Sequence, residues 1–154
     1  MKEIFSFVLY RVETLPQVLE RLPRVFDIVR RRYGDNGQIH YVSGIISGDG
    51  EERIPYNLFK LNEETLKVRK DWENHIVFSA TDVFTPQVYS GLKELRLPRE
   101  EREESFRNFW AEAITLLEVT DMHLTDGWER SPGARFEKEL AESLGIRLHF
   151  RQEL

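Results

Sequence analysis

The sequence predicts an α/β fold: a four-stranded parallel sheet of strand order 2-1-3-4 with helices on both faces, flavodoxin-like or Rossmann-like. Helical and strand patterns alternate along the chain, as expected for parallel strands joined by helical crossovers. Order 2-1-3-4 also brings the loops after the first and third strands together at the switch point, where open parallel sheets bind ligands. The expected strands are residues 39–43, 75–78, 122–125 and 146–150.

Residues 1–38 are expected to form a helical extension that precedes an α/β domain of residues 39–154. Apolar residues recur at helical spacing between Leu15 and Val29. Pro23 lies within this pattern and is expected to kink or split the helix, because proline removes a backbone donor and its ring clashes with the preceding turn. We expect the extension to brace the sheet or to form a dimer contact.

Two further helices are expected between the strands. The first, at about residues 55–72, has one apolar stripe that should be buried. The second, at about residues 99–119, begins with acidic residues, which suit the N-terminal end of a helix. The stripe of the first helix consists of Leu58, Leu61, Thr65, Val68 and Trp72.

The composition narrows the class of protein. Acidic residues outnumber basic ones by 27 to 22, which argues against general nucleic-acid binding, and the absence of cysteine excludes disulfides and thiol catalysis. None of the four histidines has metal-ligand spacing with another, so core or edge positions are expected, and His123 and His149 can meet across neighbouring strands. No apolar run approaches the roughly 20 residues of a membrane-spanning helix, so we expect a cytoplasmic protein without membrane contact.

The C-terminal helix carries the most informative pattern. Ser131 is a good N-cap, Pro132 suits the first helical position, and Gly145 is expected to end the helix. A carboxylate turned toward a core is costly unless it is paired, hydrogen-bonded or beside a cavity, and a helix start favours an anion. On a helical wheel Glu137 falls in the middle of the apolar stripe of Gly133, Phe136, Leu140, Ala141 and Leu144.

Glu137 therefore has two interpretations. It can be the catalytic carboxylate of an active site beside an anion-binding helix end. It can also be a carboxylate that is paired with a core Arg or Tyr, or that a slight rotation of the helix exposes to solvent. The periodicity leaves both interpretations open.

Other candidate residues follow the expected strands. Ser43, Gly44, Ser47 and Gly48 lie in or beside a loop of the kind that brings backbone amides close to a phosphate, although such turns are also common connectors. Asp82, Asp126 and Trp128 follow later strands. The two acids can contact a sugar or base or can serve in a turn, and the tryptophan can stack on a base or pack over the edge of the sheet.

Residues 126–146 also carry a resemblance to a known family. The motif D-G-W-E-x-S-x-G-A-R-x-E, continued by E-L-A-x-x-L-G-I, resembles the closing motif of small, largely uncharacterised proteins related to nucleoside 2-deoxyribosyltransferases and 2'-deoxynucleoside 5'-phosphate N-hydrolases. The family element Y-x-S-G-P-x-S/T-G is similar to residues 41–48, where Ile45 replaces the proline. The resemblance is weaker elsewhere.

The resemblance implies cleavage of an N-glycosidic bond, or base transfer, on a small nucleoside or nucleotide without a metal or an organic cofactor. Glu137 would be the nucleophile on the anomeric carbon, and Asp126 would contact the sugar or base. The residues implied in substrate binding, which include those that hold the sugar 5' end or its phosphate, are Tyr41, Ser43, Gly44, Ser47, Gly48, Asp82, Trp128, Ser131 and Gly133.

One position departs from the related sequences. Many of them have a carboxylate eight residues before the Asp that matches Asp121, where this chain has Ala113 beside Glu112. A non-catalytic nucleotide-binding or sensing domain with the same crevice is therefore an alternative. A third possibility is an assembly module in which residues 1–38 are the functional part, and a homodimer is expected.

Overall fold

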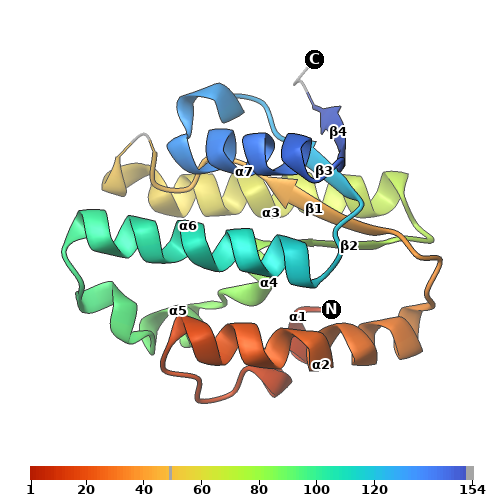
Figure 1. The fold of residues 1–154 in the computed structure, drawn as a ribbon, viewed down its shortest axis with the longest axis horizontal. Coiled ribbons are helices and arrows are strands. Elements are labelled where there is room, and N and C mark those ends of the chain that lie inside the picture. The colour runs from red at the N-terminus through yellow and green to blue at the C-terminus, as the bar shows by residue number, and fades with distance from the viewer. Residues whose placement is uncertain (49, 152–154) are drawn as a thin grey trace. The chain divides into compact units, whose positions relative to one another are not determined.

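The computed structural model describes residues 1–48 and 50–151, and the chain divides into two compact units (Figure 1). The sheet unit comprises residues 35–81 and 119–154, and the helical unit comprises residues 1–34 and 82–118. The first 34 residues therefore group with a segment from the middle of the chain, whereas the sequence predicted a separate extension of residues 1–38.

The sheet has four parallel strands: β1 (Ile39–Ser43), β2 (Ile76–Ser79), β3 (Asp121–Leu124) and β4 (Arg147–Phe150). Their order is β2-β1-β3-β4, which confirms the prediction. In the register of the sheet, His40 of β1 lies between Val77 of β2 and Asp121 of β3. Strands β1 to β3 are buried along their whole length, whereas β4 is a partly exposed edge strand.

Two helices of the sheet unit cover opposite faces of the sheet, because both crossovers are right-handed and they run in opposite directions across the sheet. Helix α3 (Ile54–Asp71) connects β1 to β2, and α7 (Pro132–Ser143) connects β3 to β4. In Figure 1, α7 lies in front of the strands and α3 behind them. Since side chains alternate along a strand, Tyr41 and Ser43 face α7, whereas His40 and Val42 face α3.

Helix α3 differs from its prediction at its first turn. It follows a short 3-10 helix, η1 (Glu51–Arg53), and buries three of the five residues of the predicted stripe, Leu61, Thr65 and Val68. Leu58, however, is 37% exposed, so its predicted burial is wrong. The reason is that Asn57 turns inward instead, where its amide Nδ2 donates to the carbonyl of Ile46 at 2.9 Å.

Helix α7 begins and ends as predicted. The hydroxyl of Ser131 accepts from the backbone N–H of Ala134 at 3.1 Å, which satisfies one of the free donors of the first turn. Pro132 is the first helical residue. Gly145 follows the helix with a φ of +71°, a left-handed conformation that glycine adopts without steric cost.

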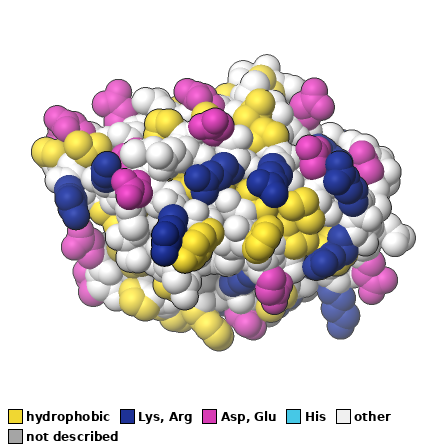
Figure 2. Space-filling model, turned by 90° about the horizontal axis from the view of Figure 1, so that it is seen from below, with side chains coloured by type: hydrophobic (Ala, Val, Ile, Leu, Met, Phe, Trp, Pro, Cys, Tyr) yellow, Lys and Arg dark blue, Asp and Glu magenta, His cyan; other side chains and the backbone are white. Residues whose placement is uncertain are grey.

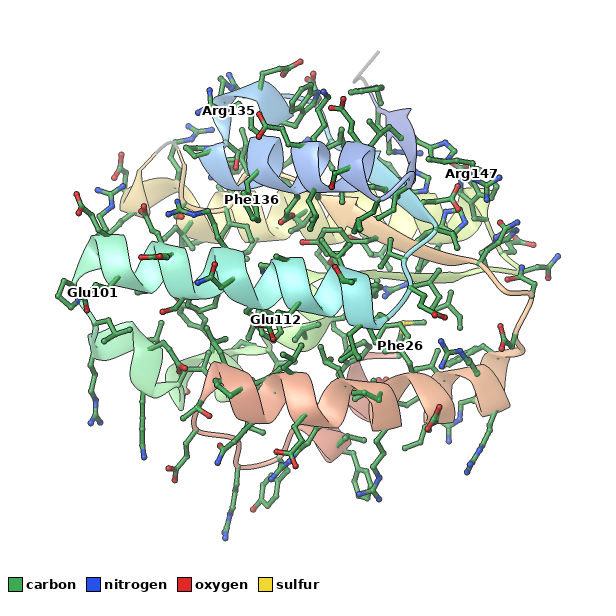
Figure 3. All side chains as sticks on the ribbon, viewed as in Figure 1. Phe26, Glu101, Glu112, Arg135, Phe136 and Arg147 are labelled. Carbon is green, nitrogen blue, oxygen red and sulfur yellow. The ribbon has the colours of Figure 1, made fainter. Side chains whose placement is uncertain are left out.

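The buried face of α7 consists of Ala134, Glu137 and Ala141. Gly133 and Leu144, which the helical wheel placed in the buried stripe, are exposed, so that part of the prediction is wrong. The helix is rotated so that small residues flank the inward carboxyl group. Arg135 projects outward from the helix (Figure 3).

The helical unit contains α1 (Lys2–Val8), α2 (Leu15–Tyr33), α5 (Pro86–Ser90), the 3-10 helix η2 (Lys93–Arg96) and α6 (Arg99–Leu116). The short helix α4 (Ala80–Val83) spans the boundary between the two units. Phe5 of α1 packs edge-on against Phe26 of α2, with ring centroids 5.9 Å apart. The hydroxyl of Thr14 caps α2 by accepting from the N–H of Gln17.

Pro23 does not split α2, which runs without a break from Leu15 to Tyr33. The expected split is therefore wrong. Buried apolar residues lie on both sides of the proline, at Leu22 and Val25, and their packing holds the helix together across the missing backbone hydrogen bond.

The surface on the side of α2 carries mixed charge. Figure 2 shows Lys and Arg side chains dispersed among acidic and hydrophobic ones on this face. This mixture agrees with the charge balance of the sequence. Within residues 1–48 and 50–151, no helix is both long enough and apolar enough to cross a bilayer.

Candidate active site

The side chain of Glu137 points into the sheet unit and is only 7% exposed. The Tyr41 hydroxyl donates to Oε1 at 2.8 Å and to Oε2 at 3.3 Å, and the Ser43 hydroxyl donates to Oε1 at 2.9 Å. Both donors come from β1, two positions apart on the face toward α7. Glu137 is therefore buried and bonded to a tyrosine and a serine. Among the described residues, it has no Lys or Arg partner.

Burial sets the charge of this carboxyl group. Desolvation raises the pKa of Glu137 from 4.5 to about 7, while the hydrogen bonds from Tyr41 and Ser43 act in the opposite direction. At neutral pH the group is therefore a mixture of acid and carboxylate. Burial and the neighbouring carboxyl raise the pKa of Tyr41 well above 10, so its hydroxyl remains a donor.

The two oxygens of Glu137 are not equivalent. Oε1 accepts both of the shorter hydrogen bonds, whereas Oε2 accepts only the longer contact from Tyr41. Oε2 therefore has the lone pairs that are least engaged. Of the two oxygens, it is the one better able to form a new bond.

The loops after β1 and β3 meet at the carboxyl ends of their strands, as the strand order predicted. The N–H of Thr125 donates to the carbonyl of Ser43 at 3.0 Å. A Cβ on Gly44 would lie 2.3 Å from Oγ1 of Thr125, and one on Gly48 would lie 3.2 Å from Cα of Ser131. A side chain at position 44 would force Thr125 to move, and one at position 48 would be tight against the backbone of Ser131. The β1 loop therefore lies against both the β3 loop and the start of α7.

Two further residues shape these loops. Asn57 holds the β1 loop from α3 through its bond to Ile46. Gly127 has a φ of +83° and begins the 3-10 helix η3 (Trp128–Arg130), which leads into Ser131. The role of Asn57 was not predicted, because a polar residue in the first turn of a helix does not reveal whether it turns inward.

The start of α7 retains hydrogen-bonding capacity. The Ser131 hydroxyl accepts from Ala134 and keeps its own O–H as a donor. Gly133 is exposed, and a Cβ built on it would have only the Ser131 hydroxyl within 4 Å, at 3.8 Å. This helix end therefore has open space beside it.

The remaining predicted residues have different surroundings. Asp126 and Ser47 are exposed. The ring of Trp128 packs 5.8 Å from that of Phe150, and Lys138 Nζ lies 5.6 Å from its centroid. The other two positions that the sequence singled out, Asp82 and Ala113, belong to the helical unit and are fully buried.

The fold and the site define a Rossmann-like α/β protein with a buried acid near the carboxyl end of its sheet. The chain belongs to the family described as a domain of unknown function (DUF4406), whose model matches residues 38–150. The matched segment contains all four strands, both loops and Glu137, and it leaves out α1 and α2. No curated protein and no solved structure matched the chain.

Gly44→Ala is expected to destabilise the protein by about 1–3 kcal/mol, because the added methyl group overlaps Oγ1 of Thr125. Thr125→Ala removes that oxygen, so the double variant should recover part of the loss. Urea denaturation of the wild type, both single variants and the double variant measures the coupling. Strictly additive effects would contradict the close approach of the two loops.

Glu137→Gln is expected to stabilise the protein more at alkaline than at acidic pH. The unfolded chain releases this proton near pH 4.5 and the folded chain near 7, so the native carboxyl group costs stability as the pH rises through that interval. The difference in unfolding free energy between variant and wild type should change by on the order of 3 kcal/mol between about pH 4 and pH 8.

Denaturant titrations across this pH range measure the effect. Glu139→Gln is the matched control, because Glu139 is an exposed residue of the same helix. A Glu137→Gln difference that does not change with pH would show that the native carboxyl group titrates as it does in the unfolded chain.

Proposed function

We propose that this protein cleaves the N-glycosidic bond of a nucleoside or nucleotide, or transfers its base, with Glu137 as the nucleophile. The proposal depends on one observation: a buried carboxyl group, held by two hydroxyl donors, in the unit where two loops meet beside a helix start. The resemblance of residues 126–146 to nucleoside 2-deoxyribosyltransferases and 2'-deoxynucleoside 5'-phosphate N-hydrolases supports it.

The reaction follows from the chemistry of a carboxylate. Cleavage of the bond between the base nitrogen and the anomeric carbon builds positive charge on the sugar, which ionised Glu137 stabilises. Oε2 then forms an ester with the anomeric carbon, while the electron pair of the broken bond leaves with the base, which takes a proton from solvent. Water or a second base attacks the same carbon, loses a proton to solvent, and releases the carboxylate.

Other residues have supporting roles in this proposal. Tyr41 and Ser43 hold the carboxyl group of Glu137 in place. The substrate's sugar or base would contact Asp126 and Trp128. The 5' hydroxyl or phosphate would bind among Gly44, Ser47, Gly48, Ser131 and Gly133. These steps need neither a metal nor an organic cofactor.

The wild type is expected to release free base from at least one member of a panel of deoxynucleosides, ribonucleosides and their 5'-phosphates. Glu137→Gln should reduce this rate by about 10³-fold or more, because the amide cannot form the ester. Chromatography of the quenched reactions, with and without a second base as acceptor, measures release and transfer.

Glu139→Gln again provides the control and should keep the wild-type rate. Full activity of Glu137→Gln would remove Glu137 as the nucleophile. Failure of the wild type to release base from any substrate in the panel would count against the enzymatic proposal itself.

The rate of base release is expected to rise with pH up to about 7 and then level off, because the nucleophile must be ionised. Tyr41→Phe removes a hydrogen bond that lowers the pKa of Glu137, so this rise should move to higher pH by on the order of one unit. Initial rates at saturating substrate across the pH range measure the shift. An unmoved profile with only a raised KM would instead indicate that Tyr41 binds substrate.

A non-catalytic nucleotide-binding or sensing domain is the second candidate. It is favoured by Ala113, which is fully buried and stands where many sequences of the family that the C-terminal motif resembles have a carboxylate. In this case nucleotides would bind without turnover, and Glu137→Gln would leave their affinity unchanged. Calorimetric titration combined with the base-release assay separates the two functions.

A further inference from the structure

All four histidines of the chain gather on the face of the sheet toward α3. Nδ1 of His40 lies 2.7 Å from Nε2 of His123, and Nε2 of His40 lies 3.1 Å from Nδ1 of His75. The ring of His149 stacks on that of His123 at 4.4 Å and 11°. The meeting of His123 and His149 confirms the sequence prediction, whereas the four-membered histidine cluster was not predicted.

The histidine cluster also anchors α3. Trp72, the residue that ends this helix, places its ring 4.7 Å from His40 and 5.1 Å from His75. The same ring lies 5.5 Å from His149 and 6.0 Å from His123. The C-terminal end of α3 is therefore packed on the sheet through one indole in contact with every imidazole.

Several charged groups of β3, of α3 and of the end of β4 lie around the histidine cluster. Asp121 of β3, whose side chain is 1% exposed, accepts from Arg147 at 2.9 Å and from His149 at 2.8 Å, and its Oδ1 lies 3.7 Å from Nε2 of His40. Arg151, just after β4, pairs with Glu64 and Asp71 of α3. Two more cations on α3 are engaged elsewhere: Lys67 pairs with Glu64 and Arg69 donates to the carbonyl of Val77.

The hydrogen bonds of the cluster have a preferred direction. Nδ1 of His123 is buried and, among the described residues, has no partner. Because a buried unpaired N–H is rarer than a buried unpaired acceptor, the proton of His123 belongs on Nε2. His123 then donates to His40, and His40 donates from Nε2 to His75, with the carboxylate of Asp121 close to that proton.

A further proton on His40 or His123 has no good place in this arrangement. On Nδ1 of His123 it would be a buried donor without an acceptor, and on a shared nitrogen it would break a hydrogen bond. Accordingly, burial lowers the pKa of His40 from 6.5 to about 4 and that of His123 to about 3. Burial acts to raise the pKa of Asp121, but hydrogen bonds from His149 and Thr120 outweigh this effect and hold that pKa below its usual value.

We propose that the histidine cluster is an acid-sensitive latch: it holds the C-terminal end of α3 and the edge strand β4 on the sheet while His40 and His123 are neutral, and releases them when the pH falls. The latch lies on the opposite face of the sheet from Glu137 and does not depend on the proposed enzymatic activity.

Acid favours the open form because the open form binds more protons. Between pH 6.5 and about 4, His40 and His123 bind protons in the open form but stay neutral in the closed form. Each of these imidazoles shifts the equilibrium toward the open form by up to about tenfold per pH unit. Glu137 opposes this below pH 7, but it is one group against two and lies on the other face of the sheet.

Amide hydrogen exchange of the full-length protein, corrected for the intrinsic effect of pH, tests the latch. As the pH falls from 7 to about 5, protection should fall by at least tenfold at the C-terminal end of α3 and in β4, and by less in α7. In His123→Leu the same segments should respond much less to acid. Met122→Leu, the neighbouring buried position of β3, is the control and should keep the wild-type response.

A measurement on the wild type covers the case in which His123→Leu does not fold. Nitrogen-15 spectra of the imidazoles report tautomer and charge, and every signal belongs to the cluster because the chain has four histidines. His40 and His123 should appear as neutral Nε2–H tautomers down to below about pH 5. Titration of both near pH 6.5 in the closed protein would overturn the latch. So would a uniform loss of protection, or an acid response that His123→Leu leaves unchanged.

Discussion

The burial of one carboxyl group against two hydroxyls is the constraint on which the geometry and the chemistry of the site depend. Glu137 lies on the inward face of α7, and its partners Tyr41 and Ser43 lie on the facing side of β1. A buried carboxyl group without these donors would be costly. With them it is held in one orientation, with Oε2 the less engaged oxygen. The burial and the hydrogen bonds thus set both the direction and the charge of the group.

The sheet separates two polar groups whose effects on stability oppose each other. On the α7 side, Glu137 costs stability as the pH rises above 4.5, because burial favours its neutral form. On the α3 side, His40 and His123 cost stability as the pH falls below 6.5, for the same reason applied to a base. Because Glu137 destabilises the fold at higher pH and the two histidines destabilise it at lower pH, these groups favour maximal stability in an intermediate pH range. Each face therefore has a polar cluster that apolar packing alone would not require.

The features that sequence analysis predicted are those set by local patterns. The alternation of elements leads to a parallel sheet with helical crossovers, and the order 2-1-3-4 is the one that brings the loops after the first and third strands together. A helical wheel was enough to predict that Glu137 faces inward. The glycines of the β1 loop and the cap at Ser131 were also visible in the sequence, because tight approaches and helix starts need particular residue types. The meeting of the two loops then follows from the strand order.

The missed features depend on contacts between distant segments. Pairing of Glu137 with a core tyrosine was one interpretation of the sequence, but its partner Tyr41 lies 96 residues away and could not be identified from spacing. The histidine cluster requires the register of all four strands together with the position of Trp72. Asn57 replaced Leu58 on the inner side of α3 because the β1 loop offered it a carbonyl, and Pro23 was tolerated because packing on both sides outweighed one lost hydrogen bond.

The most direct test of the central claim is to look for the covalent intermediate on Glu137. The protein would be incubated with a substrate analogue fluorinated at the 2' position, which slows breakdown of a glycosyl ester, and analysed by intact-mass and peptide mass spectrometry. If Glu137 is the nucleophile, a mass increase of one sugar is expected on the peptide that contains Glu137, and it should be absent from Glu137→Gln. Base release from natural substrates with no such adduct, or an adduct on another residue, would contradict it.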